Sequence, residues 1–163
     1  PATGFYYNVD KQDHDFTLNR PDDLKRREII GFLPLWAGIA SPEQARRLVE
    51  TLTDPKRFWR KFGVPSLAAD DPFYEPQGYW NGPVWVEWNL LVQQGLRRYG
   101  YEREARELAG RVARVMIEGL KQDHDFWEFY SPDEAWGGYH RSYIWAGCIN
   151  RMLLESYRPE LFK

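Results

Sequence analysis

Apolar residues recur at helical spacing in five stretches of the chain, and these stretches alternate in character. Residues 27–40, 83–99 and 141–157 are apolar on most sides, which is typical of helices buried inside a domain. Residues 42–54 and 102–120 carry their apolar side chains on one face only, which predicts amphipathic helices with a solvent-facing side. The pattern therefore predicts buried and outward-facing helices in alternation.

Local signals support several of the predicted helix boundaries. Ser41, Pro42 and Gln44 form a strong helix start, because serine caps the first turn, proline suits the first helical position and glutamine completes a capping box. Pro34 is expected either to kink the first helix or to lie in its first turn. Gly100 suits the end of the third helix, because glycine readily adopts the left-handed conformation that stops a helix.

Residues 62–79 and 121–140 lack a helical period and are predicted to be long loops. Loops of this length inside a compact domain are usually functional. No stretch with strand periodicity competes with the helices, although short hairpins fit inside the loops. We therefore expect one all-α domain over residues 1–163, built from inner and outer helices that pair as hairpins.

A repeated motif supports a repeating architecture. The sequence KQDHDF occurs at residues 11–16 and again at 121–126, and Trp36-Ala37-Gly38 has a counterpart in Trp145-Ala146-Gly147 at nearly the same offset. A repeat of loop and buried helix is what a ring of helical hairpins requires. The second copy inserts Glu128 among aromatic residues, so this carboxylate belongs to one copy only, as expected of a catalytic group.

The aromatic composition favours a binding surface over a core that is merely apolar. The aromatic content is 17%, with 8 Trp and 10 Tyr, and these side chains combine a large apolar body with a polar tip. The net charge of -2 gives no bulk attraction for nucleic acid or for an anionic membrane. No signal peptide or transmembrane run is visible, so a cytoplasmic protein is the default expectation.

Metal and cofactor chemistry is not indicated by the residues. His14 and His124 each lie in an Asp-His-Asp triplet, but adjacent side chains point in different directions and no third ligand follows at helical spacing. Hydrogen bonding within a loop is the better interpretation of both. The single cysteine, Cys148, excludes an intrachain disulfide and lies in an apolar helical stretch. No metal site is expected, and no cofactor is implied.

Two aromatic segments carry the candidate chemistry. The first, GYWNGPVW from Gly78 to Trp85, is an aromatic loop that opens directly into a helix. The second, DFWEFYSPDEAWGG from Asp125 to Gly138, places Glu128 among aromatic rings. Exposed Trp and Tyr rings suit the flat apolar faces of sugars, and aromatic neighbours desolvate a carboxylate, as a general base requires.

On these two motifs the chain resembles the C-terminal half of the (α/α)6-toroid domain of glycoside hydrolase family 63, which includes processing α-glucosidases and mannosylglycerate hydrolases. Family 37 trehalases are similar more distantly. The resemblance implies hydrolysis of an α-glucosidic or related α-glycosidic bond with inversion, with Glu128 as the general base. It also implies contacts with an oligosaccharide or small glycoside from Tyr79, Trp80, Asn81, Trp85, Trp127, Tyr130, His140 and Trp145.

The chain departs from the family in two ways that keep alternatives open. Asn81 stands where the family usually has arginine, and the family's general acid, an aspartate on an earlier segment, has no counterpart here. Asp133, Glu134 and Glu87 are the nearby carboxylates, and each is interpreted as structural or solvated. Fewer helices are predicted than a complete ring needs. The alternatives are a non-catalytic carbohydrate-binding half-toroid, or a half-toroid that pairs with a second copy or a complementary segment.

Overall fold

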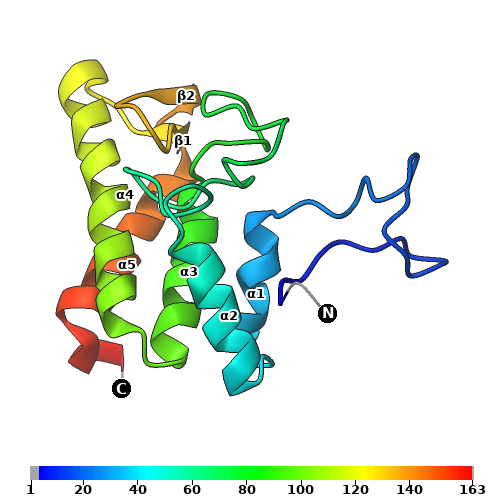
Figure 1. The fold of residues 1–163 in the computed structure, drawn as a ribbon. Coiled ribbons are helices and arrows are strands. Elements are labelled where there is room, and N and C mark those ends of the chain that lie inside the picture. Colours follow the sequence, from blue (N-terminus) through cyan, green and yellow to red (C-terminus); the bar gives the residue numbers. More distant parts are fainter. Residues whose placement is uncertain (1–3, 163) are drawn as a thin grey trace.

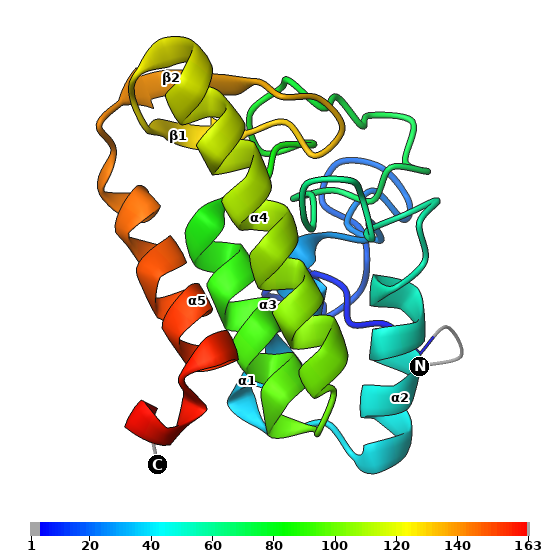
Figure 2. The same ribbon diagram turned by 90° about the vertical axis from the view of Figure 1, so that its left-hand side faces the viewer.

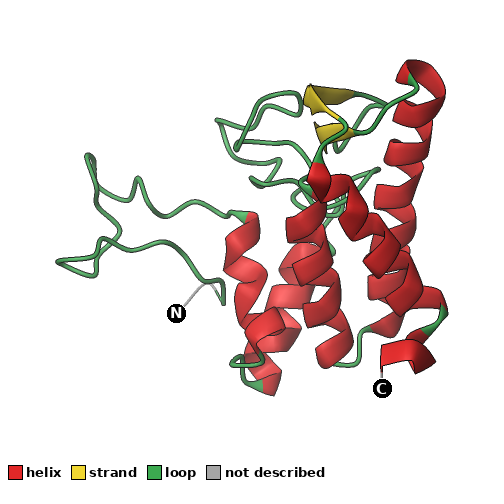
Figure 3. Cartoon of the chain, turned by 180° about the vertical axis from the view of Figure 1, so that it is seen from behind, coloured by secondary structure: helices red, strands yellow, loops and turns green. Residues whose placement is uncertain are grey.

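The computed structural model describes residues 4–162 and is predominantly helical (Figure 1). The α-helices are α1 (Leu33–Ala37), α2 (Pro42–Leu52), α3 (Val86–Arg98), α4 (Glu102–Asp123) and α5 (Cys148–Tyr157). Short 3-10 helices are η1 (Ile29–Phe32), η2 (Ile144–Gly147) and η3 (Pro159–Phe162), and the strands are β1 (Trp127–Tyr130) and β2 (Gly137–Arg141). Helix as the dominant element confirms the predicted class, and the hairpin lies inside one of the two predicted loops (Figure 3).

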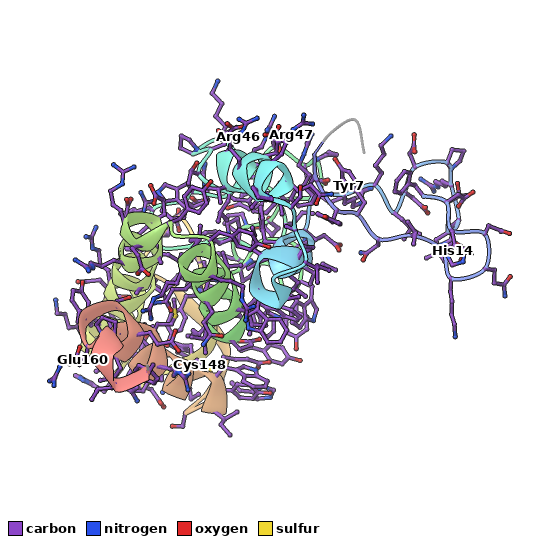
Figure 4. The ribbon with its side chains drawn as sticks, turned by 90° about the horizontal axis from the view of Figure 1, so that it is seen from below. Tyr7, His14, Arg46, Arg47, Cys148 and Glu160 are labelled. Atoms are coloured by element: carbon purple, nitrogen blue, oxygen red, sulfur yellow. The ribbon has the colours of Figure 1, made fainter. Side chains whose placement is uncertain are left out.

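The helices form two rows, and α3 lies in the middle of one of them. Helices α1 and α5 pack on either side of α3, while α4 packs against both α3 and α5. Seen from below, along the helices, α1, α3 and α5 make up one row, and α2 and α4 make up the other (Figure 4); Figure 2 shows α4 in front of α3 from the side. This arrangement is the alternation of inner and outer helices that the hydrophobic pattern predicts.

One core joins the two rows. Leu48 and Leu52 of α2, Leu96 of α3, and Leu108 and Val112 of α4 are all fully buried and belong to one cluster. Burying a leucine side chain contributes about 1.5–3 kcal/mol, so a few such residues fix how the helices pack. The apolar stripes of α2 and α4 therefore face inward, as predicted.

Helix ends follow the predicted signals, with shifts that have local causes. Ser41 and Gln44 form a reciprocal capping box at the start of α2. The helix expected over residues 27–40 is shorter, because Pro34 lies in the first turn of α1 and Gly38 ends it in the left-handed conformation at φ 72°. The helix expected from residue 83 begins at Val86, because Val84 pairs with Tyr130 through two backbone hydrogen bonds of 2.7 and 3.0 Å.

The β1–β2 hairpin contains a break in register at Glu128. Trp127 pairs with Arg141 and Phe129 with Gly138, so Glu128 alone on β1 lies opposite two residues of β2, Tyr139 and His140, and β2 carries the bulge. A bulge turns a side chain away from the regular strand alternation and is common beside functional sites. Gly138, which pairs with Phe129, leaves no room for a side chain, since a Cβ there would lie 2.2 Å from the ring of Trp136.

The KQDHDF repeat forms the same turn twice but is not a repeat of the helices. His14 and His124 both adopt the left-handed conformation, at φ 56° and 57°, and each donates its backbone N–H to the carbonyl four residues earlier. The Trp-Ala-Gly copies differ, since Trp36 lies near the end of α1 whereas Trp145 lies in η2, ahead of α5. The predicted repeat of loop and helix is therefore wrong beyond the shared turn.

The surface shows neither a membrane-spanning helix nor a metal cluster within residues 4–162. No helix in this range is both long and apolar enough to cross a bilayer. No group of three or more histidine, cysteine, aspartate or glutamate side chains in the same range is placed to hold a metal ion. The segment that carries His14 projects away from the helices as an extended arm (Figures 1 and 4).

Candidate active site

The two aromatic motifs come together at one end of the helical rows. The hairpin, the loop that leads into α3 and the first turn of α3 meet there (Figures 1 and 3). The backbone pairing of Val84 with Tyr130 joins the loop directly to β1. Tyr79 and Glu128, which are 49 positions apart in the sequence, thereby become neighbours.

Glu128 is the centre of this site. It lies on β1 opposite the bulge of β2, and only 3% of the residue is exposed. Nδ1 of His140 lies 2.6 Å from Oε2, and the hydroxyl of Tyr79 donates to Oε1 over 3.4 Å. Because an ionised carboxylate accepts only, the imidazole Nδ1–H is the donor when Glu128 is charged. Each oxygen of the buried carboxylate thus accepts a hydrogen bond, Oε2 from His140 and Oε1 from Tyr79.

His140 lies between two tyrosine rings on the solvent side of the hairpin. Its ring is edge-on to Tyr139, with centroids 4.6 Å apart, and stacks on Tyr143 at 5.8 Å with an interplanar angle of 16°. The imidazole itself is 63% exposed, although its partner carboxylate is buried. His140 therefore connects the buried carboxylate of Glu128 to the molecular surface.

Tyr79 joins the loop to the aromatic residues around Glu128. Its ring is edge-on to Trp80, Trp85 and Phe129, at centroid distances of 5.9, 5.1 and 5.5 Å. Burial of the phenol, reinforced by the charge of Glu128, raises the pKa of Tyr79. The hydroxyl therefore stays protonated in the ordinary pH range and remains a donor to the carboxylate.

Trp80 and Trp85 form a parallel stack with different exposure. Their centroids are 3.9 Å apart with an interplanar angle of 4°. Trp80 is 51% exposed, whereas Trp85 is 2% exposed and donates its indole N–H to the carbonyl of Tyr79. Trp80 offers a face to solvent and Trp85 lies behind it in the core, while the ligand contact expected of Trp85 stays a prediction.

Asn81 and Gly82 shape the loop. The side chain of Asn81 accepts from the backbone N–H of Tyr79 and donates to the carbonyl of Phe73. A Cβ on Gly82 would lie 1.9 Å from the carbonyl oxygen of Glu75, so the close approach of these two backbone segments requires glycine. In this structure the amide of Asn81 is engaged within the loop.

Three other residues were predicted to contact a ligand, namely Trp127, Tyr130 and Trp145, and none of them contacts the carboxylate of Glu128. Tyr130 is fully buried and its hydroxyl accepts from the backbone N–H of Trp127. Trp127 donates its indole N–H to Asp123 and has Arg141 over its ring. The ring of Tyr130 is covered in this structure, and its expected contact with a ligand stays a prediction. Trp145 is half-buried and reaches the site only through an edge contact with Tyr143 at 6.0 Å.

The nearby carboxylates divide into paired and unpaired groups. Asp133 pairs with Arg60 and accepts from the hydroxyl of Tyr74, each over 2.7 Å, and Glu134 accepts from Gln77. These two are structural or solvated, as interpreted from the sequence. Glu87 differs, because its Oε2 is buried without a hydrogen-bond partner and burial, followed by the charge of Glu128, raises its pKa to about 7.

Sequence reasoning missed Tyr139 and Tyr143, the two rings that hold His140. Both lie in or just after β2, a strand inside a predicted loop. The signal was a tyrosine on each side of His140, but it is interpretable only once the strand and its bulge are known. Tyr139 also contacts Tyr79 at 5.2 Å, which closes the group of aromatic rings around the carboxylate.

The fold and this site define a partial (α/α)6-toroid domain of the glycoside hydrolase type. The family model for the mannosylglycerate hydrolase MGH1-like glycoside hydrolase domain matches residues 1–146. The chain belongs to this family, which confirms the resemblance seen in the sequence. The matched region includes Glu128, Tyr79 and His140.

Curated relatives agree with the family match. Mannosylglycerate hydrolase MGH2 of Selaginella moellendorffii is 39% identical over 122 residues, which is 73% of this chain and 23% of the relative. Mannosylglycerate hydrolase of Thermus thermophilus is 31% identical over 150 residues, or 90% of this chain and 32% of the relative. The chain therefore spans about a quarter to a third of the length of these relatives.

Solved structures show the same fold. The mannosylglycerate hydrolase of glycoside hydrolase family 63 from Thermus thermophilus, in complex with Tris, superposes with a TM-score of 0.72 at 27% identity. The alignment covers 93% of this chain and 33% of that chain. Neutral trehalase Nth1 of Saccharomyces cerevisiae reaches a TM-score of 0.75 at 22% identity, covering 94% of this chain and 26% of that one, and is a likeness of fold alone.

Proposed function

We propose that this chain carries the general-base half of an inverting glycosidase site, which hydrolyses an α-linked glycoside. The observation that supports this most strongly is the environment of Glu128. Its carboxylate is buried opposite a strand bulge, held by His140 and Tyr79, and surrounded by aromatic rings in a region matched by a glycoside hydrolase family. A covered carboxylate with fixed donors is suited to orient one water molecule and remove its proton.

The proposed substrate is a small α-mannoside or α-glucoside. The names of the curated relatives support an α-mannoside of a small acid, since they are mannosylglycerate hydrolases. The exposed face of Trp80, supported from behind by Trp85, is the proposed stacking platform for a sugar ring. Tyr79 and Tyr139 would border the same ring, and His140 would reach hydroxyl groups near the scissile bond.

The proposed reaction begins with water between Glu128 and the anomeric carbon. Glu128 takes a proton from the water as oxygen attacks, while the Nδ1–H of His140 keeps the carboxylate in orientation. Inverting hydrolysis also needs a general acid about 6.5–9.5 Å from the base. We assign that acid to no residue between 4 and 162, and propose that it comes from a region equivalent to the part of the relatives that this chain does not span.

Turnover of α-mannosides and α-glucosides by this chain in combination with the region that supplies the acid, compared between the wild type and Glu128→Gln, tests the proposal. Glutamine keeps the size of the side chain but cannot accept the proton. Glu134→Gln is the matched control, because Glu134 is an exposed carboxylate in the same segment that is hydrogen-bonded to Gln77. We expect the control to retain activity and Glu128→Gln to lose it. Equal activity of all three proteins would refute the role of Glu128.

A second candidate function is pairing with further helices, and exposed apolar side chains favour it. Ile39, just after α1, is 72% exposed, and Ile144, at the start of η2, is 77% exposed. Apolar surface of this kind often marks an interface. Sedimentation at rising protein concentration tests it. A mass that increases in the wild type but stays monomeric in Ile39→Asp/Ile144→Asp supports pairing, and a monomer throughout argues against self-pairing.

A further inference from the structure

Asp133 is a carboxylate beside the candidate base that the proposed hydrolysis leaves without a direct role. It lies in the turn between β1 and β2, and its side chain is 24% exposed. Oδ2 accepts from the hydroxyl of Tyr74 over 2.7 Å, and Oδ1 accepts from Nε of Arg60, also over 2.7 Å. Hydrogen bonds to an ionised carboxylate are about twice as strong as bonds between neutral groups. Asp133 therefore joins two distant loops to the hairpin.

The turn that carries Asp133 is itself held in place. The backbone N–H groups of Asp133 and Glu134 donate to the hydroxyl of Ser131 over 3.3 and 3.2 Å, and Ser131 is fully buried. The backbone N–H of Phe62 donates to the carbonyl of Pro132 over 2.9 Å. The carboxylate of Asp133 thus has a defined position relative to β1, the strand that precedes this turn.

Tyr74 connects Asp133 to the platform loop, by which we mean residues 71–82, and this loop lies beside the hairpin (Figure 1). The residues on both sides of Tyr74 bond to Asn81. The carbonyl of Phe73 accepts from the side chain of Asn81, and the N–H of Glu75 donates to its backbone carbonyl, each over 2.9 Å. A displacement of Tyr74 is therefore passed on to Asn81.

The platform loop is bonded to the hairpin a second time, at the candidate base. Asn81 accepts from the backbone N–H of Tyr79 over 3.1 Å, and the hydroxyl of Tyr79 donates to Glu128 over 3.4 Å. The exposed ring of Trp80 is edge-on to Tyr79, with centroids 5.9 Å apart. Two tyrosine hydroxyls of one loop thus bond to two carboxylates of one hairpin segment, and the sugar platform lies on that loop.

The bond between Tyr74 and Asp133 is retained near neutral pH. Burial, followed by the bond to Asp133 and the charge of this carboxylate, raises the pKa of Tyr74, so its hydroxyl stays protonated and remains a donor. The same carboxylate raises the pKa of Arg60. All three groups therefore keep the protonation states that this arrangement requires.

We propose that Asp133 is a positioning residue of the candidate site, which holds the platform loop on the hairpin through the hydroxyl of Tyr74. The proposal rests on the proposed function. The hydrogen bonds of Asn81 within the loop do not involve Asp133, so we expect a sugar to stack on Trp80 even when this hold is lost. The sugar would then lie at a changed position relative to Glu128, and a misplacement of about 1 Å can lower a rate by about 10²-fold.

The kinetics of Tyr74→Phe test the proposal, because this change removes the hydroxyl and keeps the ring. Turnover is measured with this chain in combination with the region that supplies the general acid. We expect kcat to fall about tenfold while KM changes less than about twofold, since placement is lost and the platform is kept. An unchanged kcat, or a rise in KM alone, would overturn the proposal.

Tyr157→Phe is the matched control for Tyr74→Phe. Tyr157 is the last residue of α5 and is 58% exposed, so it loses a hydroxyl on an element that does not carry the platform loop. Its kcat and KM should equal those of the wild type. A fall in kcat of the same size in both variants would show that the loss does not depend on the bond to Asp133, and would overturn the proposal.

A double variant tests whether Tyr74 acts through Asp133. Asp133→Ala should lower kcat at least as much as Tyr74→Phe does. The double variant should be no slower than Asp133→Ala alone, because both changes remove the same bond. Losses that multiply in the double variant would mean that the two residues act independently, which would overturn the assigned path. Circular dichroism checks that Asp133→Ala is folded, and the result for Tyr74→Phe stands without it.

A tyrosine NMR measurement tests the proposal without turnover. The carbon-13 resonance of Cζ responds to the hydrogen bonding of each hydroxyl, and the Tyr79 resonance is identified by its loss in Tyr79→Phe. We expect Tyr74→Phe to shift the Tyr79 resonance, because the bond from Tyr79 to Glu128 depends on where the loop lies. Tyr157→Phe should leave it in place. A Tyr79 resonance that is unchanged in Tyr74→Phe would overturn the proposal.

The two measurements separate this inference from the proposed function. If the proposed function fails, Glu128→Gln retains full turnover while the Tyr79 resonance still responds to Tyr74→Phe. If the inference fails, Glu128→Gln loses turnover while Tyr74→Phe keeps both the kcat and the Tyr79 resonance of the wild type.

Discussion

The carboxylate of Glu128 and the imidazole of His140 meet across the β1–β2 hairpin, with 2.6 Å between Oε2 and Nδ1. Glu128 lies opposite the bulge in β2, where Tyr139 and His140 together face one residue of β1 and the regular alternation of side chains is broken. The contact joins a buried acceptor to an exposed ring that is held between Tyr139 and Tyr143. The hairpin thus orients the candidate base, and the helices below it keep the hairpin in place.

His140→Ala should lower turnover by about 10²-fold, because a carboxylate that is not held in orientation spends less time in line with the attacking water. The protein should remain folded, since the imidazole is largely exposed. Steady-state kinetics and circular dichroism measure the two quantities. Tyr143→Phe keeps the stacked ring and is the matched control. A His140→Ala variant as active as the wild type would show that the contact with Glu128 does not matter for turnover.

Trp80→Ala should affect sugar binding and Trp85→Ala should affect stability, although the two rings stack on each other. Trp80 is half exposed, so its loss should weaken sugar binding with little effect on stability. Trp85 is buried, so its removal should lower the free energy of unfolding by about 3–5 kcal/mol. Urea denaturation and the quenching of tryptophan fluorescence by added sugar distinguish them. Equal loss of stability in both variants would contradict the assigned positions.

Glu87→Gln should change how stability depends on pH. The pKa of Glu87 is raised from 4.5 to about 7 in the folded state, so the folded protein binds this proton more tightly than the unfolded chain does. The resulting stabilisation is fully present below about pH 4.5 and is lost as the pH rises through 7.

We therefore expect Glu87→Gln to be more stable than the wild type at pH 8, by about 1–2 kcal/mol after allowing for partial exposure of the group. The difference should shrink towards about pH 5, where the proton is bound in the folded state. Thermal unfolding of both proteins at several pH values on either side of the raised pKa measures it. A constant difference across this range would mean that Glu87 is not a buried titrating group.

Gly82→Ala should destabilise the loop that carries Tyr79 and Trp80. The new Cβ would lie 1.9 Å from the backbone carbonyl of Glu75, so one of the two backbone segments has to move, at a cost of about 1–3 kcal/mol. Gly110→Ala is the matched control, because a Cβ there meets nothing within 4 Å and alanine favours the helix. Urea denaturation should show a loss for Gly82→Ala and none for Gly110→Ala.

The helical framework was largely predictable because its signals are local. The capping box at Ser41 and the apolar stripes of α2 and α4 act within one or two turns, and each appears where the pattern places it. The shortened first helix reflects Gly38, whose left-handed conformation ends α1 before the apolar run does. The sequence allowed a hairpin inside the loop but did not place it, because the bulge at Tyr139 and His140 and the two glycines of β2 interrupt the alternation by which a strand is recognised.

The candidate site was predictable in its centre and less so at its edge. Glu128, Tyr79 and His140 lie in contact, as two short motifs that converge on one substrate would require. Trp85 and Tyr130 look the same as Trp80 in the sequence, because aromatic residues serve both cores and binding surfaces. Only the packing of the loop on the hairpin decides which rings are covered and which remain exposed.

The most direct test of Glu128 as the base is the turnover of a small α-mannoside by this chain together with the region that supplies the acid, compared with turnover by Glu128→Gln and followed by NMR of the released sugar. The account predicts release of the β-anomer first, as inversion requires, and a loss of at least about 10²-fold in Glu128→Gln. Equal rates in the two proteins, or first release of the α-anomer, would contradict Glu128 as the base of an inverting site.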